Sequence, residues 1–115
     1  MRYLCIYKPA KAEGAPPTQT EMDKMGKYIE QSFKEGTLLA TEGCLSSALG
    51  ARVLKTNGQF KVTDGPFTES KEVVEGFAII QAKSKEEAIQ ITKDFLNIAG
   101  EGETEIRQLY EQPAK

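Results

Sequence analysis

The sequence contains neither histidine nor tryptophan in its 115 residues. Because histidine is the usual general base near neutral pH and the commonest metal ligand, its absence removes both roles. Catalysis by a Ser-His-Asp triad or by a Cys-His pair is excluded. The two cysteines, Cys5 and Cys44, lack the spacing of a zinc site. We therefore expect no bound metal and no cofactor.

Long runs of one kind of residue are also missing. Lysine and arginine number 15, aspartate and glutamate number 17, and the charges are interspersed with a net charge of −2. Nucleic-acid-binding domains usually carry a basic stripe, so no nucleic-acid partner is expected. No apolar run approaches the roughly 18 residues of a membrane-spanning helix, and no charged-then-apolar leader is seen. We expect a cytoplasmic protein with reduced thiols and no membrane partner.

The chain does contain a regular succession of strand and helix patterns, which its length makes a single domain over residues 1–115. Capping boxes at Thr18-x-x-Glu21 and Ser84-x-x-Glu87, apolar residues at helical spacing and a following glycine predict helices at about 19–35 and 84–99. Period-two and apolar runs predict strands at 2–7, 37–45, 52–56, 59–63, 73–82 and 103–110.

The Asn57-Gly58 pair between two of these strands predicts a tight hairpin. A type I′ turn needs positive φ at both central residues, which this pair accepts. The register then places Val53 opposite Val62 and Lys55 opposite Phe60. Without the hairpin the order is β-α-β-β-α-β, the ferredoxin-like split βαβ, with both helices on one face of an antiparallel sheet. The predicted fold class is α+β with an inserted β-hairpin.

The strands at 2–7 and 73–82 are apolar on both faces. Two helices on one side would leave an apolar sheet face uncovered, which is unfavourable in water. Self-association around a closed two-fold axis is the commonest way to cover such a face. We therefore predict a homodimer in which the helix-free faces pack together, as in a dimeric α+β barrel.

Two features of this scaffold have both a structural and a functional interpretation. Met22, Met25, Ile29 and Phe33 form a stripe that either packs a helix on the sheet, the interpretation we favour, or offers an adaptable binding surface. Cys44 is either a nucleophile or a small buried apolar residue. No cation adjoins it in sequence to lower its pKa, which favours burial.

The six residues Asp64-Gly-Pro-Phe-Thr-Glu69 combine a turn, two carboxylates and an aromatic ring. Pro66 fixes the backbone, and Asp64 can either cap the turn by accepting backbone N–H groups or present a fixed carboxylate to a ligand. Phe67 either anchors the turn on the core or stacks on a ligand. These residues, with Glu42, are the candidate ligand-binding residues: Asp64, Phe67, Glu69 and Glu42.

The carboxylates also define the candidate catalytic residues, which are Asp64, Glu42 and Glu69. If they cluster, with Glu75 nearby, they raise one another's proton affinity and one of them can act as a general acid or base. A carboxylate cluster also suits a hard cation such as Mg²⁺ or Ca²⁺. The alternative is a set of ordinary salt bridges with Lys71, Arg52 or Arg107.

The same residues carry a resemblance to a known family. Asp64-Gly-Pro-Phe-Thr-Glu69 with Lys71-Glu72, together with Glu42-Gly43, Glu75-Gly76-Phe77 and Glu105-Ile-Arg107, resembles the DGPF-domain proteins of the YCII-related superfamily. The resemblance spans essentially the whole chain and implies a ferredoxin-like α+β fold that pairs as a dimer.

The functional implication of the resemblance is narrower. Some wider YCII-like members look like small lyases or dehydrochlorinases that use a His–Asp pair, and this chain has no histidine to supply it. Many DGPF members are encoded beside extracytoplasmic-function sigma factors, which implies a regulatory link. We expect a homodimer that binds a small ligand or a regulatory partner at a carboxylate-lined cleft. The alternatives are a carboxylate-dependent lyase and a sigma-factor-associated interaction module.

Overall fold

The computed structural model describes residues 1–10, 16–67 and 73–111. In chain order the elements are β1 (Arg2–Pro9), α1 (Gln19–Lys34), β2 (Leu38–Gly43), the 3-10 turn η1 (Ser47–Leu49), β3 (Ala51–Thr56), β4 (Gln59–Asp64), β5 (Gly76–Gln81), α2 (Lys85–Ala99) and β6 (Gly102–Gln108). The predicted α+β class is confirmed. Of the two helices in these described ranges, neither is long and apolar enough to span a membrane.

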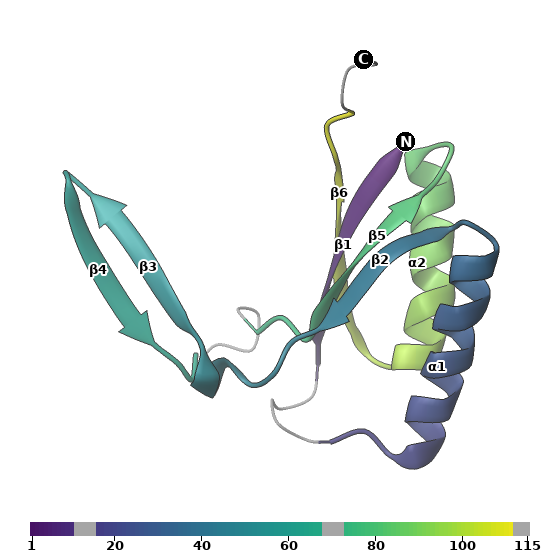
Figure 1. Ribbon diagram of the computed structural model, residues 1–115, viewed down its shortest axis with the longest axis horizontal. Coiled ribbons are helices and arrows are strands. Elements are labelled where there is room, and N and C mark those ends of the chain that lie inside the picture. The colour runs from purple at the N-terminus through teal and green to yellow at the C-terminus, as the bar shows by residue number, and fades with distance from the viewer. Residues whose placement is uncertain (11–15, 68–72, 112–115) are drawn as a thin grey trace.

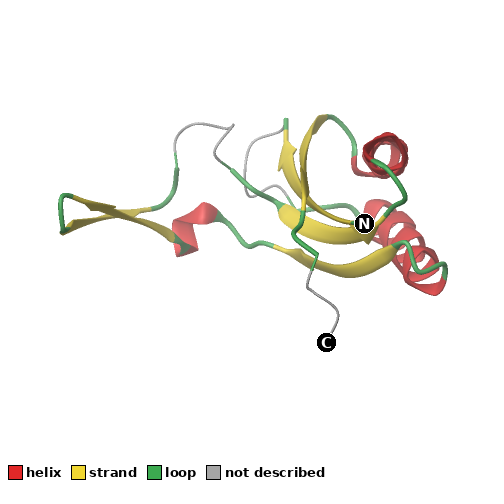
Figure 2. Ribbon diagram, turned by 90° about the horizontal axis from the view of Figure 1, so that it is seen from above, coloured by secondary structure: helices red, strands yellow, loops and turns green. Residues whose placement is uncertain are grey.

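The body of the molecule is one four-stranded sheet with two helices. The strand order is β2-β5-β1-β6, and each neighbouring pair is antiparallel. Both helices lie on one face of this sheet, and no described helix covers the other (Figures 1 and 2). With β3 and β4 set aside, the elements follow the β-α-β-β-α-β order that the sequence predicts.

The two helices begin where the capping boxes predict. The Thr18 hydroxyl accepts a hydrogen bond from the Glu21 N–H at 3.1 Å, and the Ser84 hydroxyl accepts one from the Glu87 N–H, also at 3.1 Å. These bonds satisfy N–H groups that the first helical turn leaves without a partner. Gly36, at a φ of 79°, follows the end of α1 as a terminating glycine should.

Alternation along β1 sorts its side chains between the two faces. Tyr3, Cys5 and Tyr7 are buried on the helix side, whereas Leu4 and Ile6 are half-buried on the helix-free side. The same alternation in β5 puts its even-numbered residues toward the helices. The buried cluster between helices and sheet comprises Tyr3, Cys5, Leu38, Ile80, Ala82 and Ala88.

Three expectations about this region were wrong. The paired part of β5 begins at Gly76 rather than at residue 73, because its pairing with both Tyr7 and Gly43 starts there. The second strand ends at Gly43 rather than at residue 45, where the chain leaves the sheet toward η1. Cys44 therefore lies beyond the strand end and is exposed, not buried.

The hairpin of β3 and β4 is a separate two-stranded sheet, and we call residues 51–64 the arm. Asn57 and Gly58 have φ values of 52° and 77°, and Val53 pairs with Val62, so the predicted turn and register are confirmed. The arm projects from the body on the side away from the helices (Figures 1 and 2). All the residues of its two strands are exposed.

Candidate functional site

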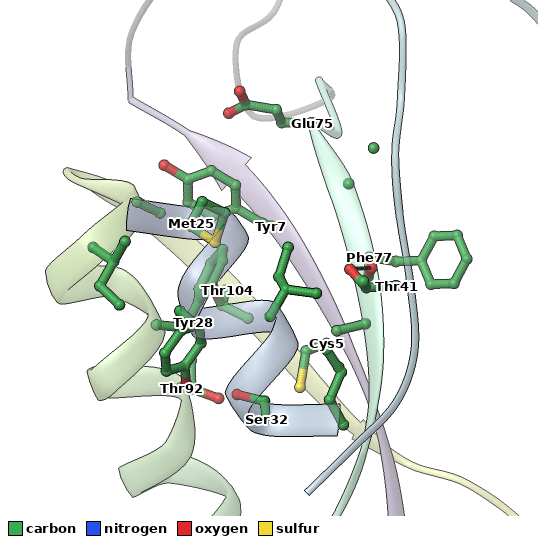
Figure 3. A pocket seen from close by; sticks show the side chains of 18 of the residues that line it. Cys5, Tyr7, Met25, Tyr28, Ser32, Thr41, Glu75, Phe77, Thr92 and Thr104 are labelled. Atoms are coloured by element: carbon green, nitrogen blue, oxygen red, sulfur yellow. Dashed lines mark hydrogen bonds between the residues drawn. The ribbon is translucent and has the colours of Figure 1, made fainter. Parts of the chain in front are cut away.

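A cavity of about 440 Å³ lies between the helices and the sheet (Figure 3). Its volume falls in the range of roughly 300–1,000 Å³ that small-molecule sites occupy. The walls are mostly apolar and aromatic. They come from the helix-facing side of the sheet and from both helices and include Cys5, Tyr7, Met22, Met25, Tyr28, Ile29, Ala78, Ile91, Phe95 and Thr104.

Polar groups of the cavity gather where β1, β5 and β6 meet. Tyr7 is the cross-strand neighbour of both Gly76 and Thr104, and Glu75 precedes Gly76. The Glu75 N–H donates to the Tyr7 carbonyl at 2.9 Å. Burial raises the pKa of the Tyr7 phenol, and the negative charge of Glu75 raises it further. The Tyr7 phenol therefore lies near a carboxylate, and Thr104 on the neighbouring strand adds a second hydroxyl to this side of the cavity.

The Thr104 hydroxyl is the distinctive group at this end. Its oxygen is buried and has no hydrogen-bond partner within the part of the chain that the structure describes. Leaving a buried hydroxyl without a partner typically costs about 1–3 kcal/mol. The Tyr7 hydroxyl, by contrast, donates to the Glu101 carbonyl at 3.3 Å, and its ring meets the Phe95 ring edge-on at 5.2 Å. Among the described residues, Thr104 is thus the lining residue with a buried side-chain polar atom that no hydrogen bond satisfies.

Deeper lining groups are held in uncharged forms. Burial raises the pKa of the Cys5 thiol, which a hydrogen bond with Thr92 only partly offsets. Burial, followed by the negative charge of Asp94, raises the pKa of the Tyr28 phenol. The Tyr28 hydroxyl donates to the Ile91 carbonyl at 3.4 Å and so links α1 to α2. This interior suits apolar atoms rather than charged ones.

Two glycines on neighbouring strands leave the end of the cavity near Glu75 without side-chain cover. Gly43 and Gly76 are cross-strand partners, and both line the cavity. A Cβ added at Gly76 would approach the Glu42 carbonyl to 2.8 Å, so the strands are close-packed there. A Cβ at Gly43 would meet only the Glu75 carbonyl, at 3.9 Å. Position 43 therefore has space for a larger side chain at the cavity wall.

The predicted site residues lie in separate places. Asp64 ends β4 at the base of the arm and is exposed. Phe67 is half-buried against the η1 region and lines a second cavity with Leu45, Leu49 and Val74. The Phe67 N–H donates to the Ser47 hydroxyl at 3.0 Å, so the turn is fastened to η1.

The remaining predicted carboxylates do not join Asp64 in one described cluster. Glu42 and Glu75 line the helix–sheet cavity, whereas Asp64 lines neither of the two cavities. Glu69 lies outside the described residues. In the ranges that the structure describes, no three acidic, cysteine or histidine side chains come together as a metal site would require. The grouping of Asp64, Glu42 and Glu69 stays a prediction.

Sequence reasoning missed most of the cavity lining. Tyr7, Tyr28 and Thr104 looked like ordinary strand and helix residues, because the space between two packed layers has no sequence signature. The methionine stripe was the available signal. Met22 and Met25 line the cavity, which favours the adaptable-surface interpretation for this half of the stripe. Phe33 at its other end is 46% exposed.

The antiparallel sheet, with two helices on one face and a cavity between sheet and helices, defines a class of small α+β protein. It does not by itself define an activity. The family comparison is more specific, since the model of the YCII-related domain matches residues 1–112. The chain therefore belongs to the YCII-related family. A search among curated proteins returned no match.

Proposed function

We propose that this YCII-related protein binds a small, largely apolar ligand in the helix–sheet cavity. The observation that carries the proposal is the Thr104 hydroxyl, whose buried oxygen has no partner in the described ranges and lies in the wall of an apolar cavity of about 440 Å³. A mainly apolar pocket with a few convergent polar groups is the usual form of a small-molecule site. A ligand that reaches Thr104 would satisfy a group that the described residues leave without a partner.

The charge at the polar end selects the kind of ligand. Glu21, Glu42 and Glu75 are the acidic residues of the lining, and the described lining holds no lysine or arginine. Glu42 is the cross-strand neighbour of Phe77 and so turns its side chain to the helix-free face, which leaves Glu75, whose charge acts on Tyr7, as the carboxylate at this end. A hydrogen-bond donor or a cation is favoured beside carboxylates, and an anion is disfavoured. We therefore propose an apolar molecule whose polar head donates hydrogen bonds, such as an amine or an alcohol, and not a fatty acid.

Competition against a fluorescent apolar probe tests this proposal. Nile red should bind with increased fluorescence and be displaced by octylamine and octanol more readily than by octanoate. Gly43→Val should reduce probe binding because the new side chain enters the cavity wall, while the fold is retained in circular dichroism. As an independent readout, octylamine should slow alkylation of Cys5, which lines the cavity. Equal probe binding by wild type and Gly43→Val would refute the site.

Glu75→Gln tests the contribution of the charge to ligand preference separately from that of the cavity. The substitution keeps the size of the side chain and removes its charge, so the preference for octylamine over octanol should fall. The change should be up to about fivefold, the size of a partly exposed ion pair. Glu103→Gln, an exposed glutamate of β6 outside the cavity lining, is the matched control and should leave the preference unchanged.

We further propose that the protein is a homodimer, the dimeric α+β barrel of its predicted fold class. The helix-free face presents Leu4, Ile6, Phe77 and Ile79 as cross-strand neighbours at its centre. Charged residues surround them, and Lys8 pairs with Glu105 at 3.4 Å. An apolar centre with a polar rim is the usual anatomy of an interface. Light scattering at about 1 μM should give twice the mass of one chain, and a folded monomer would refute this proposal.

A further inference from the structure

The arm, residues 51–64, lacks the support that such a hairpin needs. An isolated two-stranded hairpin is marginally stable in water. One face of the arm nevertheless carries Val53, Phe60 and Val62, which are 68%, 69% and 62% exposed. The radius of gyration is 16.1 Å, against about 13 Å for a compact domain of this length. The arm is thus an apolar projection that the other described segments of its own chain do not cover.

The direction in which the arm extends indicates that a second copy of the chain can cover it. The arm leaves the body on the side opposite the helices, next to the helix-free sheet face (Figures 1 and 2). A second copy packed on that face, as in the proposed homodimer, occupies the side toward which the arm extends. In a two-fold arrangement each arm then meets the other copy.

The area of the helix-free sheet face also favours an arm that packs on a second copy of the chain. Four strands about 4.8 Å apart, paired over some six residues of about 3.3 Å each, give a flat face of roughly 300–400 Å². A stable complex typically buries about 800 Å² per partner. The arm adds two further strands of six residues each to the available surface. A dimer of ordinary size needs more than the sheet face alone.

Charge also favours a second copy of this chain. The arm carries Arg52, Lys55 and Lys61 against Asp64, a net charge of +2. The rest of the chain has the other 12 basic and 16 acidic residues, a net charge of −4. The arm of one copy is therefore attracted to the body of another.

We propose that the arm is an interaction arm that packs its Val53, Phe60 and Val62 face on the body of a second copy, at the border of the helix-free sheet face. This inference rests on the proposed homodimer. The partner thereby covers an apolar surface that no described segment of the same chain covers.

Isotope-filtered NMR on a mixed dimer tests this contact directly. Labelled and unlabelled copies are mixed, and intermolecular contacts are recorded from the Phe60 ring and the Val53 and Val62 methyl groups. Contacts from these groups to side chains of β2 or β6, the edge strands that border the helix-free face, in the other copy are expected. A dimer whose arm shows no intermolecular contact overturns the inference and leaves the homodimer standing. A monomer overturns both.

A pair of matched variants provides a second measurement. Val53→Thr with Val62→Thr keeps β-branched side chains, and so the strand preference, while it makes the docking face polar. The dimer dissociation constant from sedimentation should rise about tenfold or more. Leu54→Thr changes the opposite face of the same hairpin and should alter the constant by less than about twofold. Equal effects of the two changes would overturn the assignment of the docking face.

Discussion

The guanidinium carbon of Arg52 lies 3.7 Å from the centre of the Phe67 ring. This contact joins β3, at the start of the arm, to the turn that follows β4. The Gly65 N–H donates to the Gly50 carbonyl at 3.0 Å, and the Phe67 N–H donates to the Ser47 hydroxyl at the same distance. The described part of the Asp-Gly-Pro-Phe motif therefore fixes the base of the arm against η1.

The first prediction concerns the coupling of these two side chains. In a double-mutant cycle of Arg52→Gln and Phe67→Leu, the two effects should be non-additive by about 0.5–1 kcal/mol, the size of an exposed cation–π contact. Hydrogen exchange at the amides of β3 and β4 measures the local opening free energy on which this coupling acts. Strict additivity would show that the arm base is held by the backbone bonds alone.

The second prediction contrasts two glycines that differ in the space around them. A Cβ at Gly65 would overlap the Ser47 carbonyl, whereas a Cβ at Gly26 in α1 would meet nothing within 4 Å. Gly65→Ala should therefore cost about 1–3 kcal/mol as overpacking. Gly26→Ala should stabilise the protein by about 0.5–1 kcal/mol, because alanine is the better helix former. Urea denaturation measures both, and a tolerated alanine at position 65 would contradict the close approach.

The fold was largely predictable because its local signals agree with one another. The capping boxes at Thr18 and Ser84 and the Asn57-Gly58 turn all act through neighbouring residues, and each is confirmed. Strand ends were less predictable. The end of β2 at Gly43 depends on where the chain leaves for η1, which is a tertiary matter and exposes Cys44.

The candidate site was less predictable for the same physical reason. The motif around Asp64 is recognisable from the sequence because turn residues have strong local signatures. The cavity depends on how α1 and α2 stand off the sheet, and Thr104 becomes noteworthy only when its hydroxyl is seen without a described partner. Sequence supplies the alternation that turns Thr104 toward the helices, but not the space that it faces.

The third prediction distinguishes the two interpretations of Asp64. The residue two positions on is Pro66, which has no N–H, and the Phe67 N–H donates to Ser47 rather than to the carboxylate. Asp64→Asn and Asp64→Ala should therefore each change the free energy of unfolding by less than about 0.5 kcal/mol, as exposed surface substitutions do. A loss of about 1 kcal/mol confined to the alanine variant would restore the role of a turn cap.

The fourth prediction concerns stability at alkaline pH. Burial raises the pKa of Cys5 in the folded state above its value in the unfolded chain. The stability that this neutral thiol contributes is complete below the unfolded pKa, about 8.5, and is lost as the pH rises through the higher folded pKa. Stability from denaturation should thus fall from pH 8 upward, and Cys5→Ala should flatten the curve. A slope that persists in Cys5→Ala would assign the loss to other groups.

The last prediction compares two threonines of the cavity lining, Thr92, whose hydroxyl is hydrogen-bonded, and Thr104, whose buried hydroxyl has no partner among the described residues. The Thr92 hydroxyl donates to the Ala88 carbonyl at 2.8 Å, whereas the Thr104 hydroxyl has no partner among the described residues. Valine has nearly the shape of threonine without the hydroxyl. Thr92→Val should therefore cost about 1 kcal/mol, since it removes a satisfied bond, and Thr104→Val should stabilise the free protein by about 1 kcal/mol or more.

For ligand affinity, unlike for stability, Thr104→Val should be the more damaging of the two substitutions. If an alcohol or amine head bonds to this hydroxyl, Thr104→Val should weaken octanol binding by about five- to tenfold, the equivalent of one ordinary hydrogen bond. Thr92→Val should leave that affinity nearly unchanged, because its hydroxyl already donates within α2. Thermal shifts with and without octanol measure both effects on the same samples. A variant that is more stable when free but weaker in binding indicates a group kept for function, whereas a Thr104→Val protein that loses stability and binds normally would show that the hydroxyl serves the fold.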